Sequence, residues 1–202
     1  MDPAARRAWK TTFCRSAERF WHGKFWILNE KGTFPLRSGP QVFVPNVWYK
    51  FDIIHGDASV GNHHHVIDVV RLDPSETWFG SHTRLYDSGD INLVQKRTDS
   101  NGNPIMQRAQ VHEIGHLLGL GHLDIGKPHC PPSNTNAGDC YDVTDVDMNS
   151  VMGGGMRLDI VHVAPWLTAM EAFAKAEPRS PVYTPPSKVR KTVPGFQTPA
   201  LP

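Results

Sequence analysis

The hydrophobic positions near the start of the chain repeat at helical spacing. Within residues 5–21 the apolar side chains recur at intervals of three or four residues: Trp9, Phe13, Ala17, Phe20 and Trp21. This periodicity is typical of a helix with one apolar face. We expect residues 5–21 to form the first helix of the fold.

Between residues 25 and 94 the pattern changes to short runs of aromatic and β-branched residues bounded by Gly, Pro and Asn. Such runs are typical of strands joined by turns. The expected strand regions are 25–32, 47–59, 63–72 and 77–94. The first half of the chain therefore predicts a helix followed by a mostly antiparallel or mixed sheet.

A second helix is expected after the turn-rich sequence TDSNGNP. Pro104 suits the first position of a helix, with Asn103 or Asn101 as the cap. We therefore predict a helix over about 104–118, followed by some thirty loop-like residues.

The last helical pattern covers residues 164–177, where Pro165 stands near the start. Residues 178–202 contain seven prolines in 25 positions and almost no apolar periodicity. We expect a single catalytic domain over 1–177 and an extended, poorly ordered tail over 178–202. The tail can be a linker or a docking segment for a partner, and the linker is the simpler interpretation.

Composition narrows the function classes. A chain of 202 residues suits one well-buried domain. Its 21 basic and 20 acidic side chains nearly cancel, so bulk charge does not favour nucleic acid or an anionic membrane. No run approaches the length of a membrane-spanning helix. We expect a monomer that neither binds nucleic acid nor inserts into a membrane.

The chain has three cysteines, and two of them flank a short loop. Cys130 and Cys140 enclose the sequence PPSNTNAGD, whose composition suits a surface excursion that a disulfide can close. Cys14 would then be an unpaired, idle thiol. The N-terminal residues lack the apolar region of a cleavable signal peptide. A disulfide requires an oxidising compartment, so these features favour a protein secreted or injected without a cleavable leader.

The sequence VHEIGHLLGLGH, residues 111–122, carries the candidate chemistry. His112 and His116 are four residues apart and so share one face of a helix, where both imidazoles can reach one ion. Glu113 stands beside the first histidine, where a carboxylate can take a proton from a metal-activated water. This is the H-E-x-x-H arrangement of zinc metallopeptidases.

Two further residues extend this pattern. Gly119 can adopt the left-handed conformation that ends a helix, which lets the chain return His122 to the same ion. Three protein nitrogens and one open position are typical of a catalytic zinc site. The alternative, a histidine-rich helix without metal, would leave polar side chains on an apolar face without partners.

The complete H-E-x-x-H-x-x-G-x-x-H pattern resembles that of the metzincin clan of zinc endopeptidases, whose signature continues with a Met-turn. In this sequence NSVMGGGM, residues 149–156, is similar to that turn. The resemblance covers about residues 78–175 and implies that Met152 forms a hydrophobic floor beneath the zinc without ligating it, although Met148 or Met156 can take that place.

The resemblance also implies a fold and a mechanism. The fold would be of the α/β (α+β) class: a twisted mixed sheet, with the N-terminal helix and the active-site helix above a cleft, and a small irregular lower subdomain that holds the C-terminal helix. Substrate would pair with an edge strand, either WFGSH or the segment SGDINLV. Water would attack the scissile carbonyl directly, with Glu113 as general base and then acid.

The sequence departs from the clan in two places. The residue after the third histidine is Leu123, with Asp124 one place late, so the subfamily is not assigned. No tyrosine follows Met152 closely, and Tyr141 or His129 are the alternatives that can reach the site.

Two other clusters have simpler interpretations. Adjacent residues of a strand face opposite sides, so the three histidines at 63–65 suit a surface strand better than a second metal site. Aspartates recur in the loop before the Met-turn: Asp139, Asp142, Asp145 and Asp147. They lack the full pattern of a Ca²⁺ loop, so a solvated acidic loop is the better interpretation.

The sequence thus predicts a hydrolase: a zinc-dependent metalloprotease with one catalytic Zn²⁺, acting on protein or peptide substrates. One alternative is a zinc amidase acting on peptide crosslinks of a cell wall. Another is a secreted or injected toxin-like cargo protein whose tail mediates binding. Glu113 argues against a scaffold that only holds metal, because metal binding does not need it.

Overall fold

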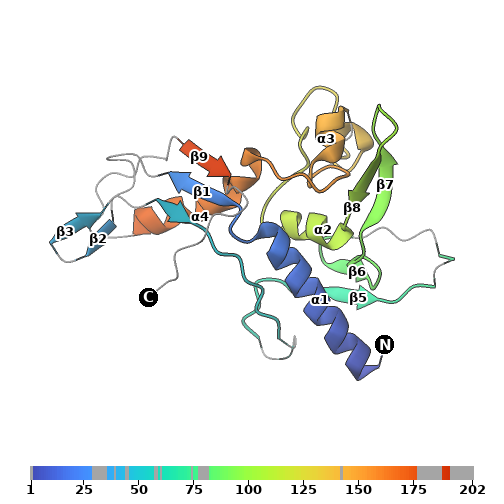
Figure 1. Cartoon of the computed structure of the whole chain (residues 1–202), viewed down its shortest axis with the longest axis horizontal. Coiled ribbons are helices and arrows are strands. Elements are labelled where there is room, and N and C mark those ends of the chain that lie inside the picture. Colours follow the sequence, from blue (N-terminus) through green and yellow to red (C-terminus); the bar gives the residue numbers. More distant parts are fainter. Residues whose placement is uncertain are drawn as a thin grey trace. The chain divides into compact units, whose positions relative to one another are not determined.

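The computed structural model describes residues 2–28, 36–38, 40–43, 46–56, 59, 61–73, 75, 76, 82–141, 143–176 and 188–191 (Figure 1). The chain divides into two compact units. Unit 1 comprises Met1–Phe20 and Ile53–Leu158, and unit 2 comprises Trp21–Asp52 and Asp159–Pro202.

The described residues form a mixed fold of four α-helices and several short strands, which confirms the predicted α+β class. The strands form one three-stranded and three two-stranded sheets. Among these described residues, no helix is both long and apolar enough to cross a membrane. The twisted mixed sheet above a cleft, which the metzincin resemblance implies, stays a prediction, as does the domain boundary after residue 177.

Unit 1 contains the first helix, two strand pairs and the helix of the histidine motif. The helices are α1 (Pro3–Trp21, as far as Phe20 in this unit), α2 (Ala109–Leu117), α3 (Asp145–Asn149) and the short 3₁₀ helix η2 (Gly138–Cys140). The strands are β5 (Asp68–Val70), β6 (Leu85–Asp87), β7 (Val94–Thr98) and β8 (Pro104–Gln107). β5 and β6 are parallel, whereas β7 and β8 form an antiparallel hairpin that leads into α2 (Figure 1).

Helix α1 confirms the prediction from hydrophobic periodicity. Phe13 and Ala17 are buried, at 6% and 0% exposure. Phe13 packs edge-on against Tyr86 of β6, with ring centroids 5.3 Å apart. Trp9 donates its indole N–H to the carbonyl of Ser88 at 2.8 Å. The predicted apolar face therefore attaches α1 to the β6 region.

The predicted start of the second helix is wrong. Pro104–Gln107 form strand β8, and α2 begins at Ala109. Asn101 and Gly102 belong to the hairpin turn, where Gly102 has φ +84° and the Asp99 carboxylate accepts from the Asn101 N–H. An Asn-Gly pair is also a hairpin signal, and Pro tolerates the first position of a strand because no ladder donor is lost there.

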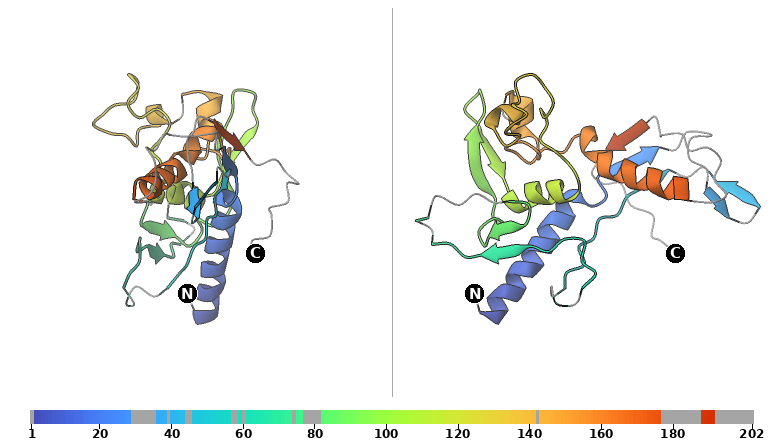
Figure 2. Two further views of the ribbon diagram at one scale, coloured as in Figure 1. Left: turned by 90° about the vertical axis from the view of Figure 1, so that its left-hand side faces the viewer. Right: turned by 180° about the vertical axis from the view of Figure 1, so that it is seen from behind.

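Gln110 connects α2 to α1. Its side chain is fully buried, and the amide nitrogen donates to the Phe13 carbonyl and to the Ser16 hydroxyl, both at 2.7 Å. A polar side chain at 0% exposure is tolerated in a core only when it is hydrogen-bonded. The histidine helix is thus connected to α1 by a polar link. The two helices lie next to each other in the ribbon views (Figure 2).

Unit 2 is built around strand β1 (Phe25–Leu28), which lies between β4 (Val47–Trp48) and β9 (Lys188–Lys191) in an antiparallel sheet. It also contains the hairpin of β2 (Leu36–Ser38) and β3 (Gln41–Phe43), the 3₁₀ helix η3 (Ile160–Val163) and helix α4 (Ala164–Ala176). The range of α4 confirms the predicted last helix. Tyr49 stacks on Trp166 of α4, with ring centroids 4.0 Å apart, and donates its hydroxyl to the Trp21 carbonyl.

Strand β9 lies within the predicted tail of 178–202. Of this tail, the structure describes these four residues. Their antiparallel pairing with β1 joins Lys188 to Leu28 and Lys191 to Phe25. Sequence composition gave no signal for this pairing, because the partner strand is more than 150 residues earlier.

The Gln110 link predicts a local loss of stability in a Gln110→Ala variant. Removing both hydrogen bonds and leaving a void should cost about 1–2 kcal/mol, or about 5- to 30-fold less protection of the α2 amides. Hydrogen exchange at Val111–Gly115 measures this effect directly. Gln95→Ala, at an exposed position of β7, is the control and should change protection little. Equal protection in the Gln110 variant and the parent would contradict the proposed role of the link.

Candidate metal centre

The three histidines of the motif converge. The Nε2 atom of His116 lies 3.1 Å from that of His112 and 3.2 Å from that of His122. Within the described part of the chain, these residues form the group whose ligand atoms lie close enough together to hold one metal ion. All three side chains are half-buried.

Each imidazole is fixed by a hydrogen bond from its other ring nitrogen. The Nδ1 atoms of His112, His116 and His122 each lie 2.8 Å from a backbone carbonyl oxygen, which belongs to Val151, Leu120 and Thr135 respectively. A carbonyl oxygen can only accept, so each Nδ1 carries the proton. The three Nε2 atoms therefore present lone pairs to one another.

This arrangement fits a metal ion. Three lone pairs at 3.1–3.2 Å repel one another unless a cation lies between them. Tetrahedral Zn²⁺ with bonds of about 2.0–2.1 Å would separate neighbouring nitrogens by about 3.3–3.4 Å. Imidazole ligands suit zinc and several other divalent transition metals. The residues present therefore match a three-histidine site with one further position open.

The protonation state of the cluster also suits metal binding. Burial lowers the pKa of His112 to about 3, assisted by repulsion from the Lys96 charge and from the charges that His116 and His122 carry when they are protonated. Burial likewise lowers the pKa of His116. Both rings are neutral at physiological pH, which is the state that ligates a metal.

Gly119 ends α2 in the way that the sequence predicts. Its φ is +93°, a left-handed conformation that favours glycine. The N–H groups of Leu120 and Gly119 donate to the carbonyls of Gly115 and His116, which together form a Schellman motif. The same turn directs the Leu120 carbonyl toward Nδ1 of His116. The helix end therefore both redirects the chain and orients the second histidine.

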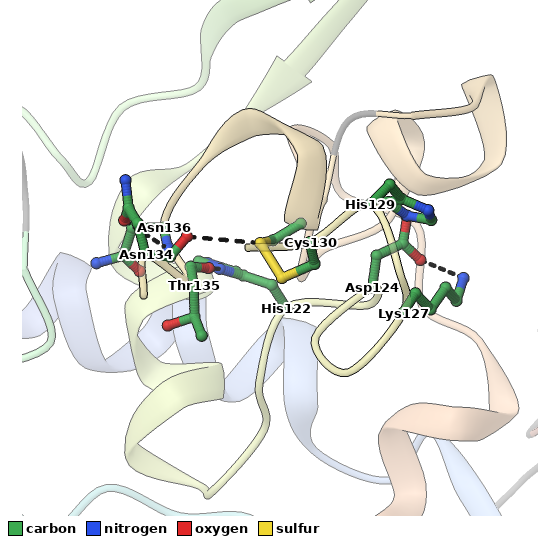
Figure 3. The surroundings of a disulfide bond; sticks show 9 residues. His122, Asp124, Lys127, His129, Cys130, Asn134, Thr135 and Asn136 are labelled. Atoms are coloured by element: carbon green, nitrogen blue, oxygen red, sulfur yellow. Dashed lines mark hydrogen bonds and ion pairs between the residues drawn. A yellow bond between two sulfur atoms is a disulfide. The ribbon is translucent and has the colours of Figure 1, made fainter. Parts of the chain in front are cut away.

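A disulfide closes the loop that holds the third histidine. Cys130 and Cys140 are bonded, as the loop composition suggested, and Cys14 is a free, buried thiol. The loop between the bonded cysteines contains Thr135, whose carbonyl lies 2.8 Å from Nδ1 of His122 (Figure 3). The orientation of His122 therefore depends on a covalently closed loop.

Asp124 fixes the segment that follows His122. Its carboxylate is 1% exposed, forms an ion pair with Lys127 and lies 3.0 Å from Nε2 of His129 (Figure 3). Burial opposes its ionisation, but the hydrogen bonds from Lys127 and His129 outweigh burial and lower the pKa of the carboxyl. The Asp124 N–H donates to the Cys140 carbonyl. Asp124, which stands two positions after His122 rather than directly after it, thus stabilises this segment.

No tyrosine closely follows Met152, and the sequence leaves Tyr141 and His129 as alternatives. Of these two, Tyr141 lies beside a histidine of the candidate centre. Its ring centroid is 4.5 Å from that of His122. The His129 imidazole instead contacts Asp124. The contact with His122 makes Tyr141 the better candidate for a phenol at the site.

The segment that the sequence predicts as a Met-turn, residues 149–156, contacts the candidate centre through its backbone. Val151 supplies the carbonyl for His112, and Met152 is fully buried. A Cβ on Gly153 would lie 1.9 Å from the Asp147 carbonyl oxygen, so this turn accepts no side chain there. The Gln107 amide donates to the Gly153 carbonyl at 2.6 Å. That Met152 forms a floor beneath a metal stays a prediction.

Glu113 is buried beside the first ligand, at 8% exposure. Burial raises the pKa of its carboxyl to about 7, with a further contribution from the charge of Asp90. The charge of Lys96 and a hydrogen bond with the Thr83 side chain oppose this rise. Glu113 is therefore a buried carboxyl beside His112 whose ionisation is opposed by its surroundings.

The remaining sequence candidates have separate positions. The Asp145 carboxylate accepts from the Ser100 N–H at 3.1 Å, and Asp147 forms a capping box with Thr144 at the start of α3. Asp142, from the same acidic loop, lies outside the described residues. So does most of the predicted edge strand WFGSH, and the segment Ser88–Leu93 forms turns before β7.

Sequence reasoning missed the groups that orient the histidines: the carbonyls of Leu120, Thr135 and Val151. Every residue has a carbonyl, so composition carries no signal for them. It also missed Thr83 and Lys96, which act on Glu113 from more than ten residues away along the chain.

Comparisons of the chain with protein-family models, with curated proteins and with solved structures found no match.

The geometry of Gly119 predicts the effect of Gly119→Ala. A side chain at positive φ costs about 1–2 kcal/mol of the free energy of unfolding. Displacement of the Leu120 carbonyl should also weaken zinc binding, by about 10-fold. Chemical denaturation without zinc and competition with a chelator measure the two effects.

Gly102→Ala is the matched control. Gly102 also has a positive φ, with no atom within 4 Å of a built Cβ, as at Gly119. It should lose comparable stability and keep its zinc affinity. An equal loss of zinc affinity in both variants would contradict the role assigned to the helix end.

The bridged loop predicts a second effect on metal binding. A Cys130→Ser/Cys140→Ser variant should lose about 2–3 kcal/mol of stability. It should also bind zinc about 10- to 100-fold more weakly, because Thr135 is no longer held at His122. Chelator competition on the folded protein measures the affinity, and Cys14→Ala is the control. Unchanged zinc affinity in the double variant would show that the loop holds its position without the bond.

Proposed function

We propose that the chain is a zinc-dependent endopeptidase of metzincin type, a hydrolase that cleaves protein or peptide substrates. The observation that carries the proposal is the convergence of the Nε2 atoms of His112, His116 and His122, with buried Glu113 beside them. The H-E-x-x-H-x-x-G-x-x-H pattern, the positive φ of Gly119 and the contact of the Met-turn backbone with His112 support the same interpretation.

The three imidazoles would hold one Zn²⁺. A bound zinc ion supplies Lewis acidity, which polarises a carbonyl group and makes a coordinated water more acidic. The donor set of three neutral nitrogens leaves room for water and substrate, which is typical of catalytic rather than structural zinc sites.

Glu113 would act as the general base and then as the general acid. It takes a proton from the attacking water and delivers it to the amine that leaves. Direct attack by water needs no protein nucleophile. The cysteines agree with this, because Cys130 and Cys140 are bonded to each other and Cys14 is buried. Tyr141, beside His122, is the candidate to contact the substrate oxygen as negative charge develops on it.

The finer features of the metzincin resemblance belong to the same proposal. They are a catalytic domain over 1–177, Met152 as the floor of the site, and substrate held along an edge strand. The Cys130–Cys140 disulfide supports a protein secreted or injected into an oxidising compartment.

The proposal predicts that Glu113→Gln abolishes hydrolysis while zinc still binds. Loss of the base should lower kcat/KM by about 10²–10⁴-fold or more. The variant keeps the three ligands, so its zinc affinity should remain close to that of the parent. The assay is cleavage of a mixed protein and peptide library, followed by mass spectrometry, at matched zinc content.

Two controls accompany this experiment. Glu76→Gln, at an exposed position, should cleave like the parent. Removal of zinc with a chelator should abolish cleavage, and added zinc should restore it. If zinc-loaded parent and variant both fail to cleave any peptide, the alternatives follow: an amidase acting on cell-wall crosslinks, or a cargo protein whose tail binds a partner.

A further inference from the structure

Three consecutive glycines, residues 153–155, follow the segment that contacts His112. Glycine has little conformational preference of its own, so contacts must fix the backbone of such a stretch. One set of contacts is steric. A Cβ on Gly153 would lie 1.9 Å from the Asp147 carbonyl oxygen. A Cβ on Gly155 would lie 2.2 Å from the carbonyl oxygen of Asn149. The glycines therefore pack directly against the backbone of α3.

A second set of contacts comes from the side chain of Gln107. Gln107 is the last residue of β8 and is buried, at 6% exposure. Its amide nitrogen donates to the Gly153 carbonyl at 2.6 Å and to the Gly155 carbonyl at 3.3 Å. An amide nitrogen has two hydrogens, so these two carbonyls use both of them. The glycine stretch is thus held between α3 and one buried amide.

His112 binds the same segment two residues before the first glycine. Its Nδ1 atom lies 2.8 Å from the Val151 carbonyl oxygen and 3.5 Å from the amide nitrogen of Gln107. Both hydrogens of that amide are already used, and 3.5 Å is too long for a strong hydrogen bond. The orientation of the His112 ring therefore depends on where the Val151 carbonyl is held.

Val151 and the glycines belong to one internally bonded loop. The N–H groups of Gly153 and Gly155 both donate to the Ser150 carbonyl at 3.0 Å. The N–H of Val151 donates to the Arg157 carbonyl at 2.9 Å, which joins the two ends of the loop. A contact that holds the glycine carbonyls consequently also restrains the Val151 carbonyl.

We propose that Gln107 is a positioning residue of the metal centre. Its amide holds the glycine carbonyls, and the Val151 carbonyl is thereby fixed where it accepts the Nδ1 proton of His112. The inference rests on the proposed zinc site and adds a residue that lies outside the H-E-x-x-H-x-x-G-x-x-H pattern. Loss of a group that orients a ligand imidazole typically weakens metal binding by about 10- to 100-fold. Gln107 acts one contact further away, so Gln107→Met should weaken zinc binding by about 10-fold.

The test compares Gln107→Met with Gln110→Met. Both glutamines are buried and both amide nitrogens make two hydrogen bonds, but Gln110 binds α1 instead of the glycine loop. Methionine has a similar size and no donor, so both variants should lose comparable stability. Competition with a chelator should show weaker zinc binding in Gln107→Met. Zinc affinity should change less than about twofold in Gln110→Met, because a slightly less stable protein still keeps its site in the competent state.

A second measurement needs no metal. Nitrogen NMR of the imidazole rings in zinc-free protein distinguishes a proton on Nδ1 from one on Nε2. His112 should carry its proton on Nδ1 in the parent and in Gln110→Met, and should show a mixture of both forms in Gln107→Met. His116 is the internal control, because its Nδ1 partner is the Leu120 carbonyl. Its proton should stay on Nδ1 in all three proteins.

Equal zinc affinity in Gln107→Met and the parent, or an unchanged His112 tautomer, would overturn the inference and leave the zinc site in place. Gln107→Asn keeps an amide on a side chain one methylene shorter, and it should change both measurements in the same direction if Gln107→Met does not fold. A parent that binds no zinc would overturn the proposed function, and the His112 tautomer in the variants would then decide the role of Gln107.

Discussion

The candidate metal centre depends on three hydrogen bonds from imidazole Nδ1–H groups to backbone carbonyls. Each bond fixes both the orientation of a ring and the position of its proton, so the Nε2 lone pair must face the other two rings. The carbonyls come from three different segments: the turn after α2, the disulfide loop and the segment that contains Val151. The candidate centre is therefore a point where three loops of unit 1 meet, and a cation among the three Nε2 atoms would relieve the repulsion of their lone pairs.

The same hydrogen bonds also give a donor to the backbone carbonyls of these loops. A backbone carbonyl needs a donor from the protein or from water, and Leu120, Thr135 and Val151 lie in turns and loops rather than in strands. The imidazoles provide that donor. Backbone conformation and ligand geometry consequently support each other, and a disturbance of one loop is transmitted to one ligand. The buried Asp124 carboxylate contributes in the same way, because its ion pair with Lys127 holds the segment between His122 and the bridged loop.

The elements that could be predicted were those encoded by local spacing. Helix α1 and helix α4 follow from apolar periodicity, and the convergence of His112, His116 and His122 follows from helix geometry and one glycine. The start of α2 was misjudged, because Pro104 and Asn103 are consistent with a strand after a turn as well as with a helix start. The pairing of β9 with β1 could not be predicted, since residues so far apart in the chain leave no periodic signal.

The position of Glu113 bears on whether the centre is catalytic. A site that only holds metal needs the three imidazoles and their carbonyls, and it gains nothing from a buried carboxyl. Burial of this group opposes its ionisation and so costs folding free energy, and the nearby Asp90 increases that cost. Thr83 and Lys96 offset part of it. A buried carboxyl that is costly to ionise, beside three converged histidines, is the feature that the proposed role of Glu113 in proton transfer would explain.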